Sequence, residues 1–143
     1  MSAEENKALV RRWIDLWNTK SQDAVAEFLT PDYVRHDPNS PEIRGAAAEA
    51  QFVGMVLAAF PDLHITIDQM IAEGDTVVGR FTLRGTQQGE FNGIPPTHKQ
   101  IAFTATETFR LQGDRIAEQW VSMDVLGMLQ QLGVIPTPGQ ANT

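Results

Sequence analysis

Residues 101–109 read Ile-Ala-Phe-Thr-Ala-Thr-Glu-Thr-Phe, a segment in which apolar side chains alternate with threonines. Successive side chains of a β-strand point to opposite faces, so this alternation predicts a strand with one buried face. Glu107 is the only charged residue on the apolar face, which it shares with Ile101, Phe103, Ala105 and Phe109. A lone inward carboxylate either belongs to a buried ion pair or lies in a cavity where an ionisable group with a shifted pKa is useful.

Three more segments near this strand show the same alternation of apolar and polar residues. They are residues 63–71, 77–83 and 116–123, and they are separated by turns at Gly74 and Gly113 and by a Gly- and Pro-rich loop at 89–97. Such segments predict half-buried antiparallel strands joined by hairpins. We therefore expect one curved, mostly antiparallel sheet from residue 63 onward.

Before Pro61 the apolar residues recur at helical spacing instead. Three helices are expected, over residues 2–18, 21–29 and 46–60. The first has a capping box, in which the side chain of Ser2 and that of Glu5 bond each other's backbone N–H groups. A region of mainly helical structure is thus predicted to precede the sheet.

The fold class follows from this order of elements. Asp124 is expected to cap a short C-terminal helix over residues 125–132. A chain of 143 residues is long enough for one domain with a buried core and too short for two of ordinary size. We expect an α+β fold, with three N-terminal helices packed on one face of the sheet, as a single domain over residues 1–135. The tail, residues 136–143, is expected to be disordered.

Composition and charge narrow the classes of function. The chain has no cysteine, which excludes disulfides, thiolate metal sites and cysteine nucleophiles, and its three histidines lack a metal-ligand spacing. A net charge of -7 argues against nucleic-acid binding. No apolar run approaches the ~20 residues of a membrane span, and the first residues lack the apolar core of a signal peptide. We expect a cytoplasmic protein without metal, nucleic acid or membrane partners.

Several short motifs follow one another in an order typical of one known family. They are Trp17-Asn18, Pro31-Asp32-Tyr33-Val34, Phe60-Pro61-Asp62, Gly93-Ile94-Pro95-Pro96-Thr97 and Asp124-Val125-Leu126-Gly127. The chain resembles, from about residue 5 to residue 133, the SnoaL-like polyketide cyclases of the nuclear transport factor 2-like (NTF2-like) superfamily. The resemblance implies a cone-shaped fold with a hydrophobic pocket between the helices and the concave sheet face. It also implies cofactor-free closure of a polyketide ester by an intramolecular aldol reaction.

The acidic positions of this family fall on different residues here. The resemblance places the acid/base aspartate of the cyclases at Val121, which cannot transfer a proton. It places a second aspartate at Asp124, whose expected role as a helix cap is a sufficient structural explanation. The pocket histidine of the cyclases falls on Glu107. Glu107 is therefore the expected proton carrier, and Asp124 is the alternative acid.

The resemblance also predicts part of the pocket wall. The pocket aromatic of the cyclases is kept as Trp17, their pocket glutamine falls on Ala105, and their pocket asparagine falls on Arg35. Trp13 lies one helical turn before Trp17, so the two form an aromatic stripe. Core packing is the default interpretation of such a stripe, and a place in a pocket wall is compatible with it.

The hairpin after residue 109 brings further residues to the same face. A three-residue turn at residues 112–114 pairs Glu107 with Gln119, and Ala105 with Val121. All four side chains then lie on the apolar face. Gln119 and Val121 are thus expected beside the pocket, with Gln119 next to Glu107.

The chemistry of Glu107 depends on these neighbours. Desolvation raises the pKa of a carboxyl, whereas a nearby Arg35 or protonated His36 lowers it. A carboxyl that titrates near neutral pH can move a proton at a carbon next to a carbonyl, and Gln119, Arg35 or His36 can stabilise the developing oxyanion. The alternative is structural: Glu107 is then a satisfied buried acid, and His36 is a capped loop residue between Arg35 and Asp37.

Trp120 falls on the strand face opposite to Glu107. Its expected neighbours there are Thr104, Thr106 and Thr108. An indole on such a face is exposed unless another subunit covers it. We therefore expect a homodimer or homotetramer formed through the outer face of the sheet.

Two functions from different classes remain. The first is a small cofactor-independent cyclase, isomerase or hydrolase that acts on a hydrophobic carbonyl or ester compound, with Glu107 as its acid/base. The second is a non-catalytic protein that binds a small hydrophobic molecule in the same pocket. Loss of Glu107 abolishes turnover in the first and changes only affinity in the second.

Overall fold

Helix α1 (Ala3–Asn18) begins at the predicted capping box. In the computed structural model, which describes residues 2–137 and 139, Ser2 Oγ accepts a hydrogen bond from the backbone N–H of Glu5 at 3.1 Å. In return, Glu5 Oε1 accepts one from the backbone N–H of Ser2 at 3.3 Å. The buried side of the helix carries Leu9, Val10, Trp13, Ile14, Leu16 and Trp17. At its C-terminal end, the Asn18 side chain bonds the backbone N–H and C=O of Ile65, which attaches the helix to the sheet.

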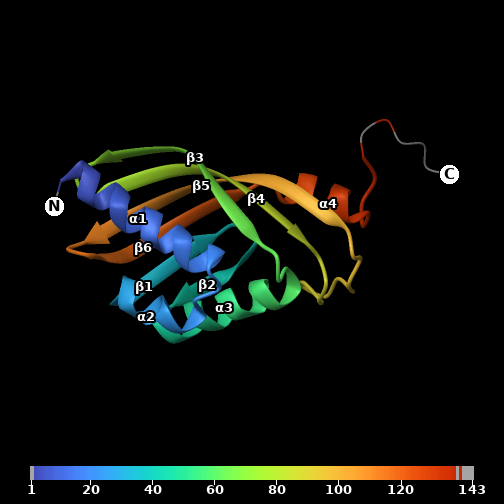
Figure 1. The fold of residues 1–143 in the computed structure, drawn as a ribbon, viewed down its shortest axis with the longest axis horizontal. Helices are drawn as coiled ribbons and strands as arrows, with labels where there is room; N and C mark the ends of the chain where they lie inside the picture. Colours follow the sequence, from blue (N-terminus) through green and yellow to red (C-terminus); the bar gives the residue numbers. More distant parts are fainter. Residues whose placement is uncertain (1, 138, 140–143) are drawn as a thin grey trace.

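Within the described residues, six strands form one mixed sheet in the order β2-β1-β6-β5-β4-β3 (Figure 1). They are β1 (Leu29–Asp37), β2 (Ser40–Arg44), β3 (His64–Glu73), β4 (Thr76–Thr86), β5 (Gln100–Gln112) and β6 (Arg115–Met123). Neighbouring strands are antiparallel except β1 and β6, which are parallel. The α+β class and the four predicted strands after residue 63 are confirmed.

Strands β1 and β2 lie between the second and third predicted helices, where the patterns of the sequence predict no strand. The side chains that β1 turns inward are Tyr33, Arg35 and Asp37. A strand whose inner face carries charged groups lacks the alternation of apolar and polar residues by which strands are recognised. The prediction that the regular structure before Pro61 is mainly helical therefore missed these two strands, which lie between the helices at Val25–Phe28 and Ala46–Ala59.

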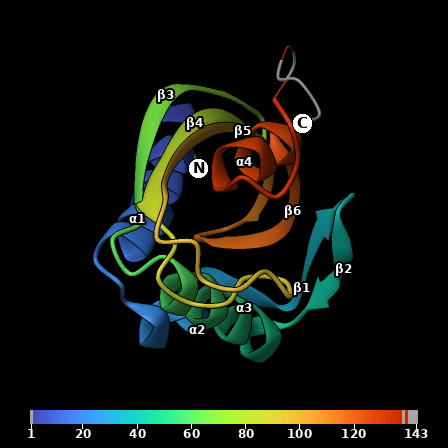
Figure 2. The same ribbon diagram turned by 90° about the vertical axis from the view of Figure 1, so that its right-hand side faces the viewer.

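The helices contact different parts of the sheet. Helix α1 packs on β3 and β4, whereas α2 (Val25–Phe28) and α3 (Ala46–Ala59) contact β1. A 3-10 turn, Gln22–Ala24, leads into α2. Helix α4 (Val125–Leu132) packs on β5. Figure 2 shows the sheet curving from β3 round to β1, with α3 below it and α4 at its near end.

The pairing of β5 with β6 differs from the predicted register by two residues. Gln112 pairs with Arg115 across a two-residue turn, and Ala117 is an extra residue that bulges out of the ladder. Glu107 therefore lies opposite Val121 rather than opposite Gln119. Beyond the bulge, this shift of two keeps the side chains of residues 118–123 on their predicted faces, because the side-chain period of a strand is two.

A buried glutamine organises the predicted loop after β4. The Gln87 side chain donates to the carbonyl oxygens of Gly89, Ile94 and Pro95 and accepts from the backbone N–H and the hydroxyl of Thr97. At the end of the fold, α4 ends at Gly133, whose φ of 81° favours glycine. In the tail predicted to be disordered, residues 138 and 140–143 lie outside the described part of the chain.

None of the helices in the described part of the chain has both the length and the apolar character needed to cross a bilayer.

Candidate active site

A cavity of about 80 Å³ lies between α1, α3 and the inner face of the sheet. Its wall is mostly apolar and includes Trp13, Trp17, Phe52, Phe60, Phe103, Ala105, Met123 and Met128. The ionisable side chains among the described residues of this wall are Arg35, Glu49 and Glu107, and Gln119 lies with them. The cavity thus has the composition of a small-molecule site, an apolar enclosure with a few polar groups at one place.

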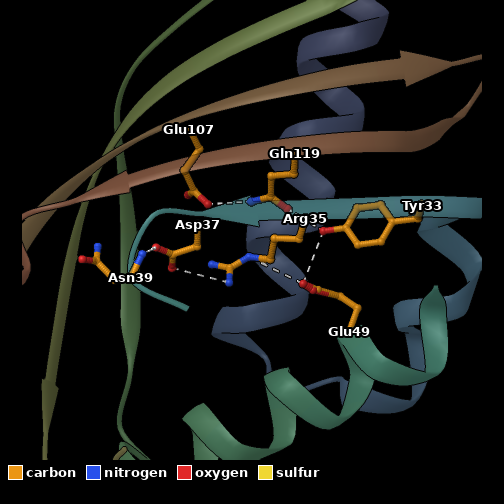
Figure 3. Close-up of polar contacts among 7 residues, drawn as sticks. All are labelled: Tyr33, Arg35, Asp37, Asn39, Glu49, Glu107 and Gln119. Carbon is orange, nitrogen blue, oxygen red and sulfur yellow. Dashed lines mark hydrogen bonds and ion pairs between the residues drawn. The ribbon is translucent and has the colours of Figure 1, made fainter. Parts of the chain in front are cut away.

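Glu107 enters the cavity from the middle of β5 (Figure 3). It is half-buried, and the surface that it keeps faces the cavity. Gln119 Nε2 donates a hydrogen bond of 2.6 Å to Glu107 Oε1. Burial raises the pKa of the Glu107 carboxyl, and the charge of Arg35 and the hydrogen bond from Gln119 offset part of this increase. A carboxyl with these neighbours can accept a proton from a bound molecule and return it.

Arg35 supplies the positive charge of the site. Its Nε lies 3.7 Å from Glu49 Oε1, and its Nη1 lies 3.9 Å from Asp37 Oδ2. The guanidinium group stacks 4.1 Å from the ring centroid of Phe52, a cation–π contact. Within the described residues, the buried Nη1 atom has no hydrogen-bond acceptor. A bound oxyanion near this nitrogen would satisfy a donor that the protein leaves free.

Glu49 is a second buried carboxyl, and the sequence interpretation missed it. It lies on α3, its exposed fraction is 0%, and burial raises its pKa to about 7 despite the charge of Arg35 and the contact with the Tyr33 hydroxyl. A signal was present in the sequence. Glu49 lies three, four and seven residues before Phe52, Val53 and Val56, so it is a lone acid on the apolar side of its helix.

Tyr33 connects the two carboxyls and was also missed. Its hydroxyl lies 2.9 Å from Gln119 Oε1 and 3.3 Å from Glu49 Oε1, and all three side chains are buried (Figure 3). Burial also raises the pKa of the Tyr33 hydroxyl, so it is neutral. The spacing Tyr33, Arg35, Asp37 is that of one strand face, and this alternation of polar residues was the available signal.

His36 lies on the other side of β1, away from the cavity. Its Nε2 is 2.6 Å from Glu118 Oε2, its Nδ1 is 3.1 Å from Glu42 Oε1, and its ring stacks on Trp120 at 5.4 Å between centroids. The hydrogen bond with His36 lowers the pKa of Glu118. Because Arg35 points inward, its neighbour in the strand must point outward. The expected pocket position of His36 is therefore wrong.

Val121 of β6 and Asp124, which follows that strand, also lie outside the cavity wall. Asp124 Oδ1 accepts a hydrogen bond of 2.9 Å from the backbone N–H of Gly127, so Asp124 is the N-cap of α4. Val121 is buried opposite Glu107 in the ladder but does not line the cavity. The carboxylate of Asp124 is thus engaged by the backbone of α4, and the residue opposite Glu107 in the ladder, Val121, is apolar.

Metal ligands do not gather at this site. Across residues 2–137 and 139, no group of three or more His, Asp or Glu side chains is arranged to hold a metal ion. The prediction that the protein works without a metal or an organic cofactor stays a prediction.

Comparison with known proteins identifies relatives over nearly the whole chain. Residues 7–132 match the sequence model of a family described as SnoaL-like polyketide cyclase. Aklanonic acid methyl ester cyclase DnrD of Streptomyces peucetius is 31% identical over 91% of this chain and 92% of its own length. Aklanonic acid methyl ester cyclase DauD of Streptomyces sp. strain C5 is also 31% identical, over 91% of this chain and 83% of its own length.

A solved structure shows the same fold. AclR of Streptomyces galilaeus, for which a hydroxylase role has been suggested, superposes with a TM-score of 0.86 at 29% identity. The superposition covers 97% of this chain and 87% of AclR.

Proposed function

Since this chain belongs to the SnoaL-like polyketide cyclase family, we propose that it is a cofactor-independent enzyme of the cyclase type whose proton carrier is Glu107. The substrate is a hydrophobic carbonyl or ester compound. The observation that carries the proposal is the position of Glu107 in an apolar cavity, next to Arg35 and hydrogen-bonded to Gln119.

The observed register supports a role for Glu107 in place of the aspartate of the cyclases. The resemblance to the family places its acid/base aspartate at Val121, and Glu107 is the residue that pairs with Val121 across the β5–β6 ladder. Side chains that face each other in a ladder lie about 5 Å apart at Cβ. The neighbouring strand therefore supplies a carboxyl close to the position at which the resemblance places that aspartate.

A ring closure at this site needs one proton to leave carbon and one to reach oxygen. The Glu107 carboxylate takes the proton from a carbon next to an ester carbonyl, and the charge that develops on the carbonyl oxygen is stabilised by Arg35. The carbanion then attacks a ketone carbon of the same molecule. The resulting alkoxide takes the proton back from Glu107, so the product is an isomer of the substrate and the enzyme is unchanged.

Exchange at the carbon acid tests the first step directly. Hydrophobic β-keto esters and aklanonic acid methyl ester are incubated with the protein in D2O, and loss of the α-proton signal is followed by NMR. Glu107→Gln is expected to slow exchange and ring closure by about 100-fold or more with an unchanged circular dichroism spectrum. Glu73→Gln is the matched control, because Glu73 is an exposed residue at the end of β3.

The same experiment decides between catalysis and binding alone. If Glu107→Gln leaves exchange and closure unchanged while altering the affinity for the same esters, the chain is a binding protein for a small hydrophobic molecule. The apolar wall of the cavity favours that second candidate.

We also propose that the chain forms a homodimer or homotetramer through the outer face of the sheet. Val78, Thr108, Trp120 and His36 form a row across four strands of that face, because each pairs with the next. Val78 and Trp120 are 37% and 40% exposed. Covering this row removes apolar surface from water, which stabilises association by about 25 cal/mol per Å².

A further inference from the structure

The hydroxyl of Tyr33 lies between two oxygen atoms, and it has only one proton to donate. Gln119 Oε1 is 2.9 Å away and Glu49 Oε1 is 3.3 Å away. One of these contacts is the donation from Tyr33. In the other contact Tyr33 must be the acceptor, or two lone pairs face each other in a buried place.

The amide of Gln119 decides which contact receives the proton. Its Nε2 donates to Glu107 Oε1 at 2.6 Å, so its oxygen faces Tyr33. An amide oxygen can only accept, and the Tyr33 proton is therefore used in this bond. The remaining contact, between Tyr33 and Glu49, is a hydrogen bond only if Glu49 is protonated and donates.

We propose that Glu49 holds a proton at the start of a directed chain of hydrogen bonds, from Glu49 through Tyr33 and Gln119 to Glu107, which keeps Glu107 ionised and ready to accept a proton. This inference rests on the proposed function of Glu107. Glu49 and Tyr33 are positioning residues in it, since they act on Glu107 through Gln119.

The surroundings of Glu49 agree with a neutral carboxyl. Glu49 is fully buried, and its Oε2 has no hydrogen-bond partner among the described residues, a costly situation for an ionised group. Its separation of 3.7 Å from Arg35 Nε is too long for a hydrogen bond. Burial also raises the pKa of Glu49 to about 7.

The charged side chains around Glu49 also favour its protonated form. Arg35 comes from β1 and Glu107 from β5, and the other described residues that line the cavity carry no charge apart from Glu49 itself. Asp37 of β1 lies on the other side of Arg35, 3.9 Å from its Nη1. With both glutamates ionised, one cation would face three anions in a buried space. A proton on Glu49 removes one of these anions.

The same chain of hydrogen bonds can also run in the opposite direction. Rotating the Gln119 amide by 180° turns its nitrogen toward Tyr33 and its oxygen toward Glu107. Every donor then reverses: Glu107 must be protonated, and Tyr33 donates to an ionised Glu49. Each direction of the chain places one proton on one of the two carboxyls, and only the observed direction leaves Glu107 as a base.

Substitution of Glu49 by glutamine separates this role from that of an ion pair. The amide of Glu49→Gln can donate to Tyr33 as a protonated carboxyl does, but it has no charge to pair with Arg35. Glu49→Met removes both the donor and the charge. Tyr33→Phe interrupts the chain and leaves both carboxyls in place.

The measurement is the titration of Glu107 in the full chain without ligand. Glutamate carboxyls are labelled with carbon-13 and followed by NMR from pH 4 to pH 9, and the signals of Glu49 and Glu107 are assigned from Glu49→Gln and Glu107→Gln. We expect Glu49→Gln to leave the midpoint of Glu107 in place and Tyr33→Phe to move it to higher pH. Glu49→Met is expected to act as Tyr33→Phe does.

Two results would overturn the inference: an unchanged Glu107 midpoint in Tyr33→Phe, or a shift in Glu49→Gln as large as that in Tyr33→Phe. Both deciding variants are close in shape to the native residues, so the test does not depend on whether Glu49→Met folds. The readout needs no turnover. Failure of the proposed activity, seen in the exchange assay, is therefore distinguishable from failure of the hydrogen-bond chain.

Discussion

Gln119 donates a 2.6 Å hydrogen bond to Glu107, although the two residues are not partners in the β5–β6 ladder. Glu107 pairs with Val121, and Gln119 pairs with Phe109. The bond is therefore a diagonal one between two long side chains on the same face of the sheet. It connects Glu107, through Gln119 and Tyr33, with the polar groups of β1 and α3.

Arg35 is expected to be necessary for stability mainly at high pH. Arg35→Met removes the cation that faces Asp37, Glu49 and Glu107, and removing one partner of a buried pair costs about 3–5 kcal/mol. Burial raises the pKa values of Glu49 and Glu107, so their protonated forms are favoured at low pH and the cost is smaller there. Urea unfolding at pH 5 and at pH 8 measures the difference. Equal losses at both pH values would contradict this prediction, and Arg35→Lys, which keeps the charge, is the control.

Glu49 should make the protein less stable as the pH rises. Its folded pKa of about 7 exceeds the ordinary value of 4.5, so the folded state binds more protons between these pH values, and stability falls from pH 4.5 upward. The full effect is about 3 kcal/mol above pH 7. Glutamine does not titrate in this range, so Glu49→Gln removes this dependence of stability on pH. We expect the variant to match the native chain at pH 4.5 and to be more stable at pH 8, as measured by urea unfolding.

Asp124→Asn is expected to change turnover little. Asparagine is as good an N-cap as aspartate, so α4 keeps its first hydrogen bond, to the N–H of Gly127. Turnover of the same keto esters is the measurement, and thermal unfolding shows whether the cap is kept. Loss of activity in a folded Asp124→Asn protein would instead assign the proton transfer to Asp124.

Trp120→Arg is expected to separate the proposed oligomer into folded monomers. Trp120 lies on the outer face of the sheet, stacked on His36, and it contributes nothing to the cavity wall. Sedimentation at micromolar concentration measures the assembly, and circular dichroism confirms that the protomer is folded. A native chain that sediments as a monomer would refute the proposed interface. Thr104→Arg, a substitution of another outward residue of β5, tests how far the interface extends.

Local features of the chain were readable in the sequence. The capping box of Ser2 and Glu5, the N-cap Asp124 and the strands after residue 63 depend on residues close together in the chain, and the structure confirms them. The inward direction of Glu107 was readable for the same reason. Successive side chains of a strand point to opposite faces, whichever strands lie next to it. The apolar residues two positions before and after Glu107, Ala105 and Phe109, therefore indicate which face it occupies.

Contacts between distant segments were decided by the tertiary structure. The bulge at Ala117 sets the partner of Glu107, and the parallel pairing of β1 with β6 brings Tyr33 to Gln119 and turns His36 outward. No local pattern specifies such pairings, because they depend on which segments meet when the core closes. The sequence by itself therefore determined that an acid points into an apolar interior. Only the assembled fold decided that Tyr33 and Glu49 join Arg35 and Gln119 beside it.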